Sequence, residues 1–289
     1  MGETTRRIRS SGGQSRAIPV DGPTLIALCD GYIDMDLSRF PDVVRGIGDD
    51  LAIADGQDLD DMTLSVNAFL IVAGDRLCLV DAGDGTRRGA HLGNLPRALK
   101  QAGYAPEDIT DLFMTHLHGD HAAGLVVGET QVYPRAMLHV AQDEIAFWQN
   151  PSALDAIQAT QAPVAEAALR VYRERLVPIR PGDLILPDVR VRALPGHTPG
   201  QVGYQLGHAN PILISGDVLH LPALQVKHPH WGFVFDADRA NALTTRKAIL
   251  AETAQSGLRL AGAHIPFPGV VGIVDRDDGP NYVVMQTDD

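Results

Sequence analysis

The sequence predicts one domain built as a four-layer αββα sandwich, in which two mixed β-sheets pack face to face and helices flank them. Along the 289 residues, β-favouring apolar runs fall into two groups, and segments with helical periodicity accompany each group. No linker rich in Pro, Gly or Ser separates the groups, so both sheets are expected in the same domain. We predict this domain at residues 23–289, after a flexible arm at residues 1–22 that contains several Arg, Ser and Gly.

The first half of the chain carries the signals of one sheet. Apolar runs at residues 24–33 and 64–81, the second broken by a Gly-Asp turn, predict paired core strands. Residues 45–62 lie between them and hold six Asp, but their spacing fits no Ca²⁺ loop, so a solvated loop is expected there. Apolar residues at helical spacing predict a helix over residues 92–102, and a short buried strand is expected at residues 111–115.

Helical and strand signals alternate again in the rest of the chain. Residues 142–175 are expected to form two helices, because Pro163 removes a backbone donor and clashes with the preceding turn. A further helix is expected at residues 238–256, closed by Gly257. Apolar runs predict the strands of the second sheet, near residues 183–194, 201–206, 211–215, 259–263, 269–274 and 282–286.

The composition excludes some classes of function. A formal net charge of −12 disfavours a nucleic-acid partner, since such binding depends on clustered Lys and Arg that neutralise phosphates. No apolar run approaches the ~20 residues that cross a bilayer. The first 20 residues lack the apolar stretch of a signal peptide, so a cytoplasmic protein without membrane contact is expected. Cys29 and Cys78 lie inside apolar runs and are expected to be buried free thiols.

The strongest chemical signal is the segment from Thr115 to His121, THLHGDH, which directly follows a predicted strand. It holds three imidazoles and a carboxylate. On an extended segment, residues i and i+2 point the same way, so His116 and His118 can bind one ion together. Asp120 and His121 follow the glycine and can face a second ion. Neutral imidazoles and carboxylates are the ligands expected for Zn²⁺ or another borderline divalent metal.

Three further candidate ligands stand at the ends of predicted strands. His197 lies in LPGHTPG, Asp217 in ILISGDVLH and His264 in LAGAHIPFPG, and in each segment a β-rich run stops at small residues. Three loops could therefore present ligands at one rim of the sandwich. The expected division assigns His116, His118 and His197 to one metal, Asp120, His121 and His264 to the other, and Asp217 to both. The remaining histidines lack partners at ligand spacing and are expected to be structural or surface residues: His91, His139, His208, His228 and His230.

These elements together resemble the metallo-β-lactamase superfamily. The HxHxDH motif at residues 116–121 follows LVDAG and precedes GHTPG, SGD and AH, in the superfamily's order, over roughly residues 63–275. The resemblance implies the metallo-β-lactamase fold and hydrolysis by two divalent ions that share a bridging hydroxide. Zinc is the expected metal, with manganese, cobalt or iron as alternatives. Asp81 and Thr115 are expected to hold the second nitrogens of metal-binding histidines.

Within the superfamily, the sequence is most similar to methyl parathion hydrolase and its relatives, which hydrolyse organophosphate triesters, aryl esters and lactones. The similar segments are residues 102–125, the Phe147-Trp148 pair, GDVLH and GAHIPFPG. The expected substrate is a small neutral or apolar ester, lactone or phosphotriester. N-acyl-homoserine lactonases share the metal motif, but a tyrosine commonly stands three positions after their bridging Asp, where this chain has His220. Quorum quenching is therefore the alternative function. Relatives in this branch are often homodimers, and the sequence does not decide whether this protein is one.

Three other functions are weighed against this one. Glyoxalase II thioesterases share the seven ligands, but they add a helical segment after the last His, where strands are expected here. Iron-dependent oxidoreductases of the same fold replace the second His of the motif with Glu, and this chain has His118. The third function is that of a binding module, which would hold metal without catalysing a reaction.

The resemblance also implies roles around the metals. Asp120 is expected to pass a proton to the leaving group, and His220 is expected either to assist near the substrate or to serve a structural role. Phe147 and Trp148 are expected to line the substrate pocket or to belong to the core. Phe233 and Phe235 alternate on a strand-like segment, and at most one of them is expected to face the pocket.

Overall fold

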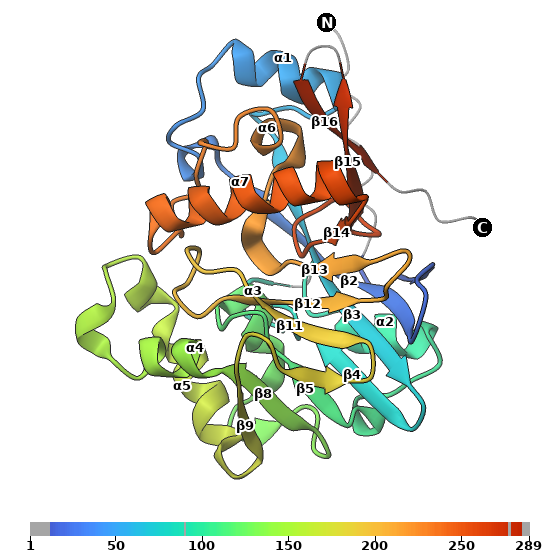
Figure 1. The fold of residues 1–289 in the computed structure, drawn as a ribbon. Helices are drawn as coiled ribbons and strands as arrows, with labels where there is room; N and C mark the ends of the chain where they lie inside the picture. The colour runs from blue at the N-terminus through green and yellow to red at the C-terminus, as the bar shows by residue number, and fades with distance from the viewer. Residues whose placement is uncertain (1–11, 90, 277–278, 285–289) are drawn as a thin grey trace, which may run out of the picture.

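The predicted four layers are present in the computed structural model, which describes residues 12–89, 91–276 and 279–284 (Figure 1). Two seven-stranded sheets form the middle layers. Helices α2 (Leu95–Gln101), α4 (Gln142–Trp148) and α5 (Ala162–Val171) cover the first sheet, and α7 (Arg239–Ser256) covers the second. The αββα architecture expected from the alternation of strand and helix signals is confirmed.

The first sheet has the strand order β1-β2-β3-β4-β5-β8-β9. Neighbours from β1 to β4 pair antiparallel, whereas β4, β5, β8 and β9 pair parallel, so the sheet is mixed. The strands are β1 (Ser15–Ile18), β2 (Thr24–Met35), β3 (Met62–Ala73), β4 (Arg76–Val80), β5 (Asp111–Phe113), β8 (Met137–Ala141) and β9 (Leu176–Ile179).

The second sheet runs from β10 to β16 in sequence order. Its pairs are antiparallel except β13 with β14, which are parallel because α7 lies between them in the chain. Its strands are β10 (Leu184–Leu186), β11 (Val189–Ala193), β12 (Val202–Leu206), β13 (Ile212–Ile214), β14 (Arg259–Ala261), β15 (Val270–Arg276) and β16 (Gly279–Val284). Strands β6 (Val126–Val127) and β7 (Thr130–Gln131) form a separate small hairpin.

The other helices are short. The α-helices are α1 (Ile47–Ala54), α3 (Gly119–Ala122) and α6 (Pro222–Gln225). The 3-10 turns are η1 (Leu37–Arg39), η2 (Pro106–Asp108), η3 (Ala123–Leu125), η4 (Pro151–Ala153), η5 (Gln158–Thr160), η6 (Arg173–Arg175) and η7 (Gly216–Val218). Among the described helices, none combines the length and the apolar character needed to cross a bilayer.

Side chains that alternate along the strands of the first sheet contribute to two separate apolar cores. In β4, Leu79 faces the helices that cover the first sheet, whereas Cys78 and Val80 face the second sheet. Leu112 and Phe113 of β5 divide in the same way. A strand covered on both faces reads as a continuous apolar run, and this explains the unbroken hydrophobic letters of these segments. Both cysteines are buried and free, as predicted.

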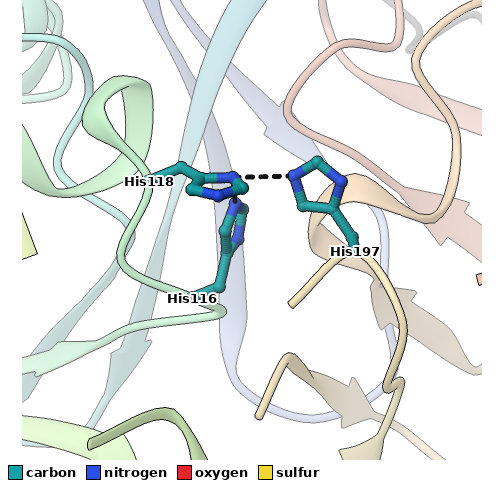
Figure 2. A group of neighbouring side chains, drawn as sticks. All are labelled: His116, His118 and His197. Carbon is teal, nitrogen blue, oxygen red and sulfur yellow. Dashed lines mark hydrogen bonds between the residues drawn. The ribbon is translucent and has the colours of Figure 1, made fainter. Parts of the chain in front are cut away.

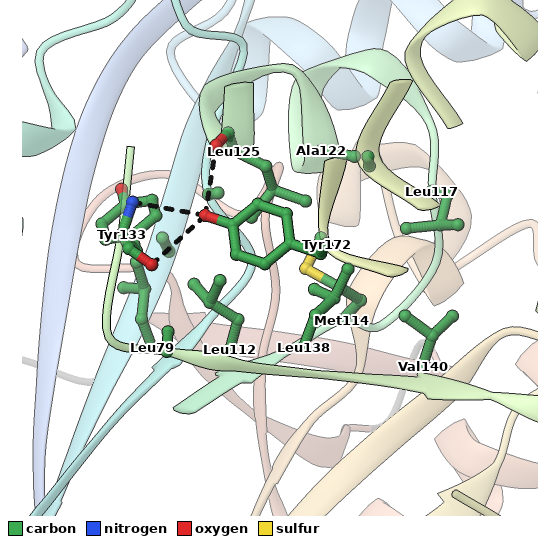
Figure 3. Close-up of a cluster of buried hydrophobic side chains, with 14 of the residues drawn as sticks. Leu79, Leu112, Met114, Leu117, Ala122, Leu125, Tyr133, Leu138, Val140 and Tyr172 are labelled. Carbon is green, nitrogen blue, oxygen red and sulfur yellow. Dashed lines mark hydrogen bonds between the residues drawn. The ribbon is translucent and has the colours of Figure 1, made fainter. Parts of the chain in front are cut away.

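Beneath the first sheet, one tyrosine links the core to its surroundings (Figure 3). Tyr172 packs among the leucines of the neighbouring strands β4, β5 and β8, and its hydroxyl donates to the carbonyls of Leu125 and Tyr133, at 3.3 and 3.4 Å. The same oxygen accepts the Tyr133 backbone N–H at 3.2 Å. The buried phenol is therefore satisfied, as a polar group in a core has to be.

Two predictions about irregular segments are wrong in part. Residues 45–62, expected as a solvated loop, contain helix α1, because the Asp49 carboxylate accepts the Gly46 N–H at its first turn and Ala52 packs in a small core with Trp231. Residues 1–22, expected as a flexible arm, contain β1, which pairs in register with β2. Residues 1–11 of that arm lie outside the described residues.

The helical region at residues 142–175 is divided as Pro163 requires. Helix α4 ends at Trp148, and Pro163 stands in the first turn of α5, where its missing N–H costs no hydrogen bond. Helix α7 begins after Asp238, whose side chain accepts the Asn241 N–H, and ends at Gly257 with a left-handed backbone, φ 71°. These boundaries confirm the capping signals in the sequence.

At the start of β5, a buried carboxylate ties the two sheets together. Asp111 accepts hydrogen bonds from Arg76 (3.0 Å to Nε), from His139 (2.8 Å) and from Thr110 (2.7 Å). Arg76 also donates to the Ile185 carbonyl in the second sheet at 3.0 Å. Burial opposes ionisation of Asp111, but the hydrogen bonds from His139, Arg76 and Thr110 outweigh it and lower the pKa of this carboxyl.

We expect Asp111→Asn to lower the free energy of unfolding by about 2 kcal/mol, because charge-assisted hydrogen bonds are lost inside the protein. Urea unfolding at pH 7 measures it, with the exposed Glu107→Gln as a control that should change little. Since folding lowers the pKa of Asp111, its contribution is present above the ordinary value of 3.8 and disappears as the pH falls below it. A gap between wild type and variant that widens below pH 4 would contradict this account.

Candidate metal centre

All seven predicted ligands converge where strands of both sheets end. His116, His118, Asp120 and His121 follow β5, with the last two on α3. His197 lies between β11 and β12, Asp217 lies in η7 after β13, and His264 follows β14. The six side chains His116, His118, His121, His197, Asp217 and His264 are buried, and Asp120 keeps 14% of its side chain exposed.

The first predicted group is tightly gathered (Figure 2). His118 Nδ1 lies 3.1 Å from His116 Nε2 and 2.8 Å from His197 Nε2. Nitrogens bound at 2.0–2.1 Å to one tetrahedral zinc ion are about 3.3 Å apart, so the three atoms are close to the spacing of a shared cation.

The second predicted group also comes together. Ligand atoms of Asp120, His121 and His264 lie within 4.8 Å of one another. The Asp217 carboxylate lies between the groups: Oδ2 is 3.3 Å from His197 Nε2 and 3.2 Å from His264 Nε2, and Oδ1 is 3.2 Å from His121 Nε2. This position is the one that a carboxylate shared by two cations requires.

Asp81 orients the HxHxDH motif through hydrogen bonds. Its backbone has a left-handed φ of 59°, which is uncommon for a residue other than glycine. Its carboxylate accepts the Thr115 N–H and hydroxyl, both at 2.8 Å, and the His121 Nδ1–H at 2.8 Å. The Thr115 hydroxyl also lies 3.1 Å from His116 Nδ1. Both residues thus contact the ring nitrogen of a candidate ligand.

The other three imidazoles have partners that the sequence did not reveal. His197 Nδ1 is 2.9 Å from Asp236, His118 Nε2 is 2.8 Å from the Gln158 side-chain oxygen, and His264 Nδ1 is 2.8 Å from a backbone carbonyl. The carbonyl belongs to Ser65 of β3. None of these partners has a sequence signal of its own, because each lies in a segment far from its histidine. Every candidate imidazole ligand therefore has its second nitrogen held, which fixes the ring's orientation.

Glu144 of α4 is a further buried residue that sequence reasoning missed. Its carboxylate accepts the Leu117 N–H at 2.9 Å, the Trp148 indole N–H at 2.6 Å and the Thr198 hydroxyl at 2.6 Å. It therefore joins the HxHxDH loop to the GHTPG loop. A Cβ at Gly200 would lie 2.0 Å from the Glu144 nitrogen, so only glycine permits this close approach.

The electrostatics suit cation binding. Burial lowers the pKa of His116 and lowers that of His118 to about 3, so both imidazoles are neutral at pH 7 with lone pairs available. Burial opposes the charge on Asp217, but His264, His121 and His220 outweigh it and lower the pKa of that carboxyl. His121 Nε2 and Asp217 Oδ1 lie 3.2 Å apart, and neither has a well-aligned hydrogen-bond partner among the described residues. Burial opposes a charge on His121, but Asp217 and Asp81 outweigh it and raise the pKa of this imidazole, so its nitrogen lies where positive charge is favoured.

A small cavity of about 40 Å³ opens onto the ligands. It is lined by Met35, Leu64, Arg88, His118, Asp120, Gln161, His197, Asp217, Phe233, Phe235 and His264. Phe233 lines it as predicted. The expectation that at most one of Phe233 and Phe235 faces the pocket is wrong, because this segment is a loop with turns and strand alternation does not apply.

Phe147 and Trp148 occupy the core instead of the pocket wall. Both belong to the apolar cluster beneath the first sheet, with exposures of 9% and 1%. Trp148 meets the His118 ring edge-on at 5.6 Å, so it supports a ligand without lining the described cavity. Of the two positions expected for these residues, pocket or core, their contacts favour the core.

His220 lies behind Asp217. Its Nε2 is 3.2 Å from Asp217 Oδ2, and its ring packs against Phe233 at 4.1 Å. It is buried and absent from the described cavity lining, and together with His197 and Asp217 it forms a further group close enough to hold a cation. Of the other histidines, His139 pairs with Asp111 and the exposed His208 pairs with Asp188, as expected for structural and surface residues.

Fold and ligand geometry together define a candidate metal centre, and comparisons with known proteins identify a family of metal-dependent hydrolases. The model of the Metallo-beta-lactamase superfamily matches residues 62–264. The chain therefore belongs to the metallo-β-lactamase superfamily.

Two solved structures are similar over most of the chain. AidC, described as a dizinc quorum-quenching lactonase in complex with a homoserine product, is 25% identical with a TM-score of 0.89, covering 96% of this chain and 99% of AidC. The hydrolase AbOPH is 28% identical with a TM-score of 0.89 and the same coverage of both chains. The anti-Pycsar protein Apyc1 of Paenibacillus is 26% identical over 170 residues, and the match spans 56% of this chain and 63% of that protein.

We expect Asp236→Asn to weaken metal binding by about 10- to 100-fold, because His197 loses the carboxylate that orients its ring. Competition with a chromogenic chelator measures the affinity. Asp188→Asn removes a similar carboxylate from His208 at the surface, 2.7 Å away, and should leave metal affinity unchanged. Equal affinities in wild type and Asp236→Asn would show that this contact does not tune the ligand.

Proposed function

We propose that the protein is a dinuclear zinc hydrolase of ester-type bonds, acting on small lactones and aryl esters, with organophosphate triesters as a further candidate. The observation that carries the proposal is the Asp217 carboxylate, which lies between two groups of imidazoles whose outer nitrogens are all held. Of the four overlapping groups that could hold a cation, one contains three imidazoles and another contains two imidazoles with Asp120, while Asp217 belongs to the other two. Manganese, cobalt and iron suit the same donors.

The comparisons favour a lactone among these substrates. AidC is named as a lactonase and is similar over nearly its whole length. N-acyl-homoserine lactones therefore belong in the substrate screen, although His220 stands where such lactonases commonly have a tyrosine. A glyoxalase II-like activity is disfavoured because, in the part of the chain that the structure describes, strands β15 and β16 follow His264.

Two bound divalent cations would supply Lewis acidity and a water whose pKa is lowered toward neutrality. The chain's own residues would position the substrate and move the proton. Asp120 lines the cavity and is partly exposed, so it can pass a proton to the leaving oxygen. Phe233 and Phe235 would exclude water and contact the apolar part of the substrate. His220 would position Asp217.

We expect His118→Ala and Asp217→Asn each to lose bound metal and at least about 100-fold of the esterase and lactonase activity together, because ligands act as a unit. Elemental analysis and kcat/KM on 4-nitrophenyl acetate, a γ-lactone, an N-acyl-homoserine lactone and paraoxon measure both properties. Chelation should abolish activity, and added zinc should restore it. His208→Ala, which alters an exposed histidine, is the control.

Full turnover by Asp217→Asn with both metals bound would contradict the shared-carboxylate assignment. Stoichiometric metal without turnover of any substrate would favour a binding module, and iron with oxygen consumption would favour a redox enzyme.

We expect Phe233→Ala to change the ratio of kcat/KM between a lactone and an aryl ester by about 10-fold with metal content intact, because its ring lines the cavity. Phe147→Ala removes a ring from the core, so it should lower the free energy of unfolding by about 3 kcal/mol and leave the ratio unchanged. The reverse pattern would place Phe147, and not Phe233, beside the substrate.

A further inference from the structure

One cationic side chain faces the metal centre and has no role in holding it. Arg88 lines the cavity together with the candidate ligands and is the one Lys or Arg among the described lining residues. Its Nε lies 3.4 Å from Asp84 Oδ1, and its terminal nitrogen lies 4.0 Å from Asp120 Oδ2. The second separation is too long for a hydrogen bond. No hydrogen bond to another described residue engages the guanidinium, so its donors remain available.

The surrounding charges leave this arginine without full compensation. Arg87 and Arg88 share one buried carboxylate, Asp84, at 3.4 Å each. The other nearby carboxylate, Asp120, is a candidate ligand and would direct its charge to a cation. If Asp120 binds a cation, Arg88 is left with only a share of the Asp84 charge.

Arg87 and Arg88 are neighbours in the chain but line different cavities. The Arg87 side chain lies over Gly119, where a Cβ would meet its guanidinium at 2.2 Å, and its Nη1 lies 3.5 Å from Gln161. It lines an adjacent apolar crevice of about 410 Å³ and not the described metal cavity. Arg88 alone of the pair is directed at the reacting centre, with about a third of its side chain exposed.

We propose, on the basis of the proposed function, that Arg88 determines specificity by binding a carboxylate on the substrate, away from the scissile bond. The substrate class is an ester or lactone that carries one carboxylate. A guanidinium binds a carboxylate through paired, charge-assisted hydrogen bonds, and the apolar walls formed by Met35, Phe233 and Phe235 strengthen them. A single cation matches the one charge of a carboxylate, whereas a phosphate monoester carries nearly two.

A substrate with a carboxylate departs from the neutral substrate expected from the sequence. The net charge of −12 acts at long range and is screened over about 10 Å in ordinary buffer, whereas Arg88 acts by contact inside the cavity. The remainder of the substrate can still be apolar and contact the two phenylalanines.

The test uses matched substrates on the metal-loaded protein. Mono(4-nitrophenyl) glutarate carries a carboxylate, and 4-nitrophenyl pentanoate has the same acyl length without it. We expect Arg88→Met to lower the ratio of kcat/KM for the anionic over the neutral ester by about 10- to 100-fold, mainly through KM. Arg88→Lys should restore part of the ratio, because it returns the charge without the paired donors.

Arg87→Met is the matched control, since it removes the same charge beside the same carboxylate but outside the cavity. It should change the ratio by less than about 3-fold. An equal loss in Arg87→Met and Arg88→Met, or an unchanged ratio in Arg88→Met, would overturn the assignment. Metal content, measured in each variant, should stay at the wild-type value.

A binding measurement separates this inference from the proposed function. The corresponding anilides, glutaric mono(4-nitroanilide) and its pentanoic counterpart, report affinity by calorimetry without ester hydrolysis. If neither ester is hydrolysed but the anionic anilide binds about 10-fold more weakly to Arg88→Met, the proposed function fails and the Arg88 assignment stands. If both esters are hydrolysed and the anionic anilide binds equally to wild type and Arg88→Met, the assignment fails and the function stands.

Discussion

The centre depends on hydrogen bonds that hold each imidazole from behind. Five histidines present one nitrogen to the shared space only because Thr115, Gln158, Asp81, Asp236 and the Ser65 carbonyl occupy the other. Without these partners, a buried ring could rotate, and several lone pairs could not be aimed at one point. The partners come from both sheets and from the loops between them, so the precision of the site is a property of the whole sandwich.

The strand ends explain how so many distant residues meet. Strands β5, β13 and β14 each deliver a ligand segment just beyond their last paired residue, and packing between the sheets fixes the distance between those ends. The Asp111 cluster ties the opposite end of β5 to the second sheet through Arg76. Glu144 joins two of the ligand loops directly. The packed sheets and loops thus fix the positions of the ligand side chains before any ion binds. Hydrolytic catalysis requires a preorganised site of this kind.

Much of this arrangement could be predicted from sequence, and the failures have common physical causes. Helix α1 was missed because an acidic, glycine-containing segment has no helical periodicity of its own, and its stability comes from Ala52 packing near Trp231. Strand β1 was missed because edge pairing needs only backbone groups. Phe147 and Trp148 belong to the core and Phe235 lines the cavity, because side-chain direction in short helices and loops is decided by packing. The arm of residues 1–11, a homodimer and a cytoplasmic location stay predictions.

The sequence by itself determined the layers, the seven candidate ligands and their division into two groups, because strand periodicity and ligand chemistry are local and leave residue patterns such as HxHxDH. Only the tertiary structure decided which residues besides Asp81 and Thr115 hold the ligands, and that Phe235 and Arg88 line the cavity. Asp236, Gln158 and Glu144 act across separations of 27 to 54 residues, and Arg88 is directed at the centre by the fold of its loop. Segments that hydrogen-bond at such separations have no fixed spacing in the sequence, so no local residue pattern predicts the contact.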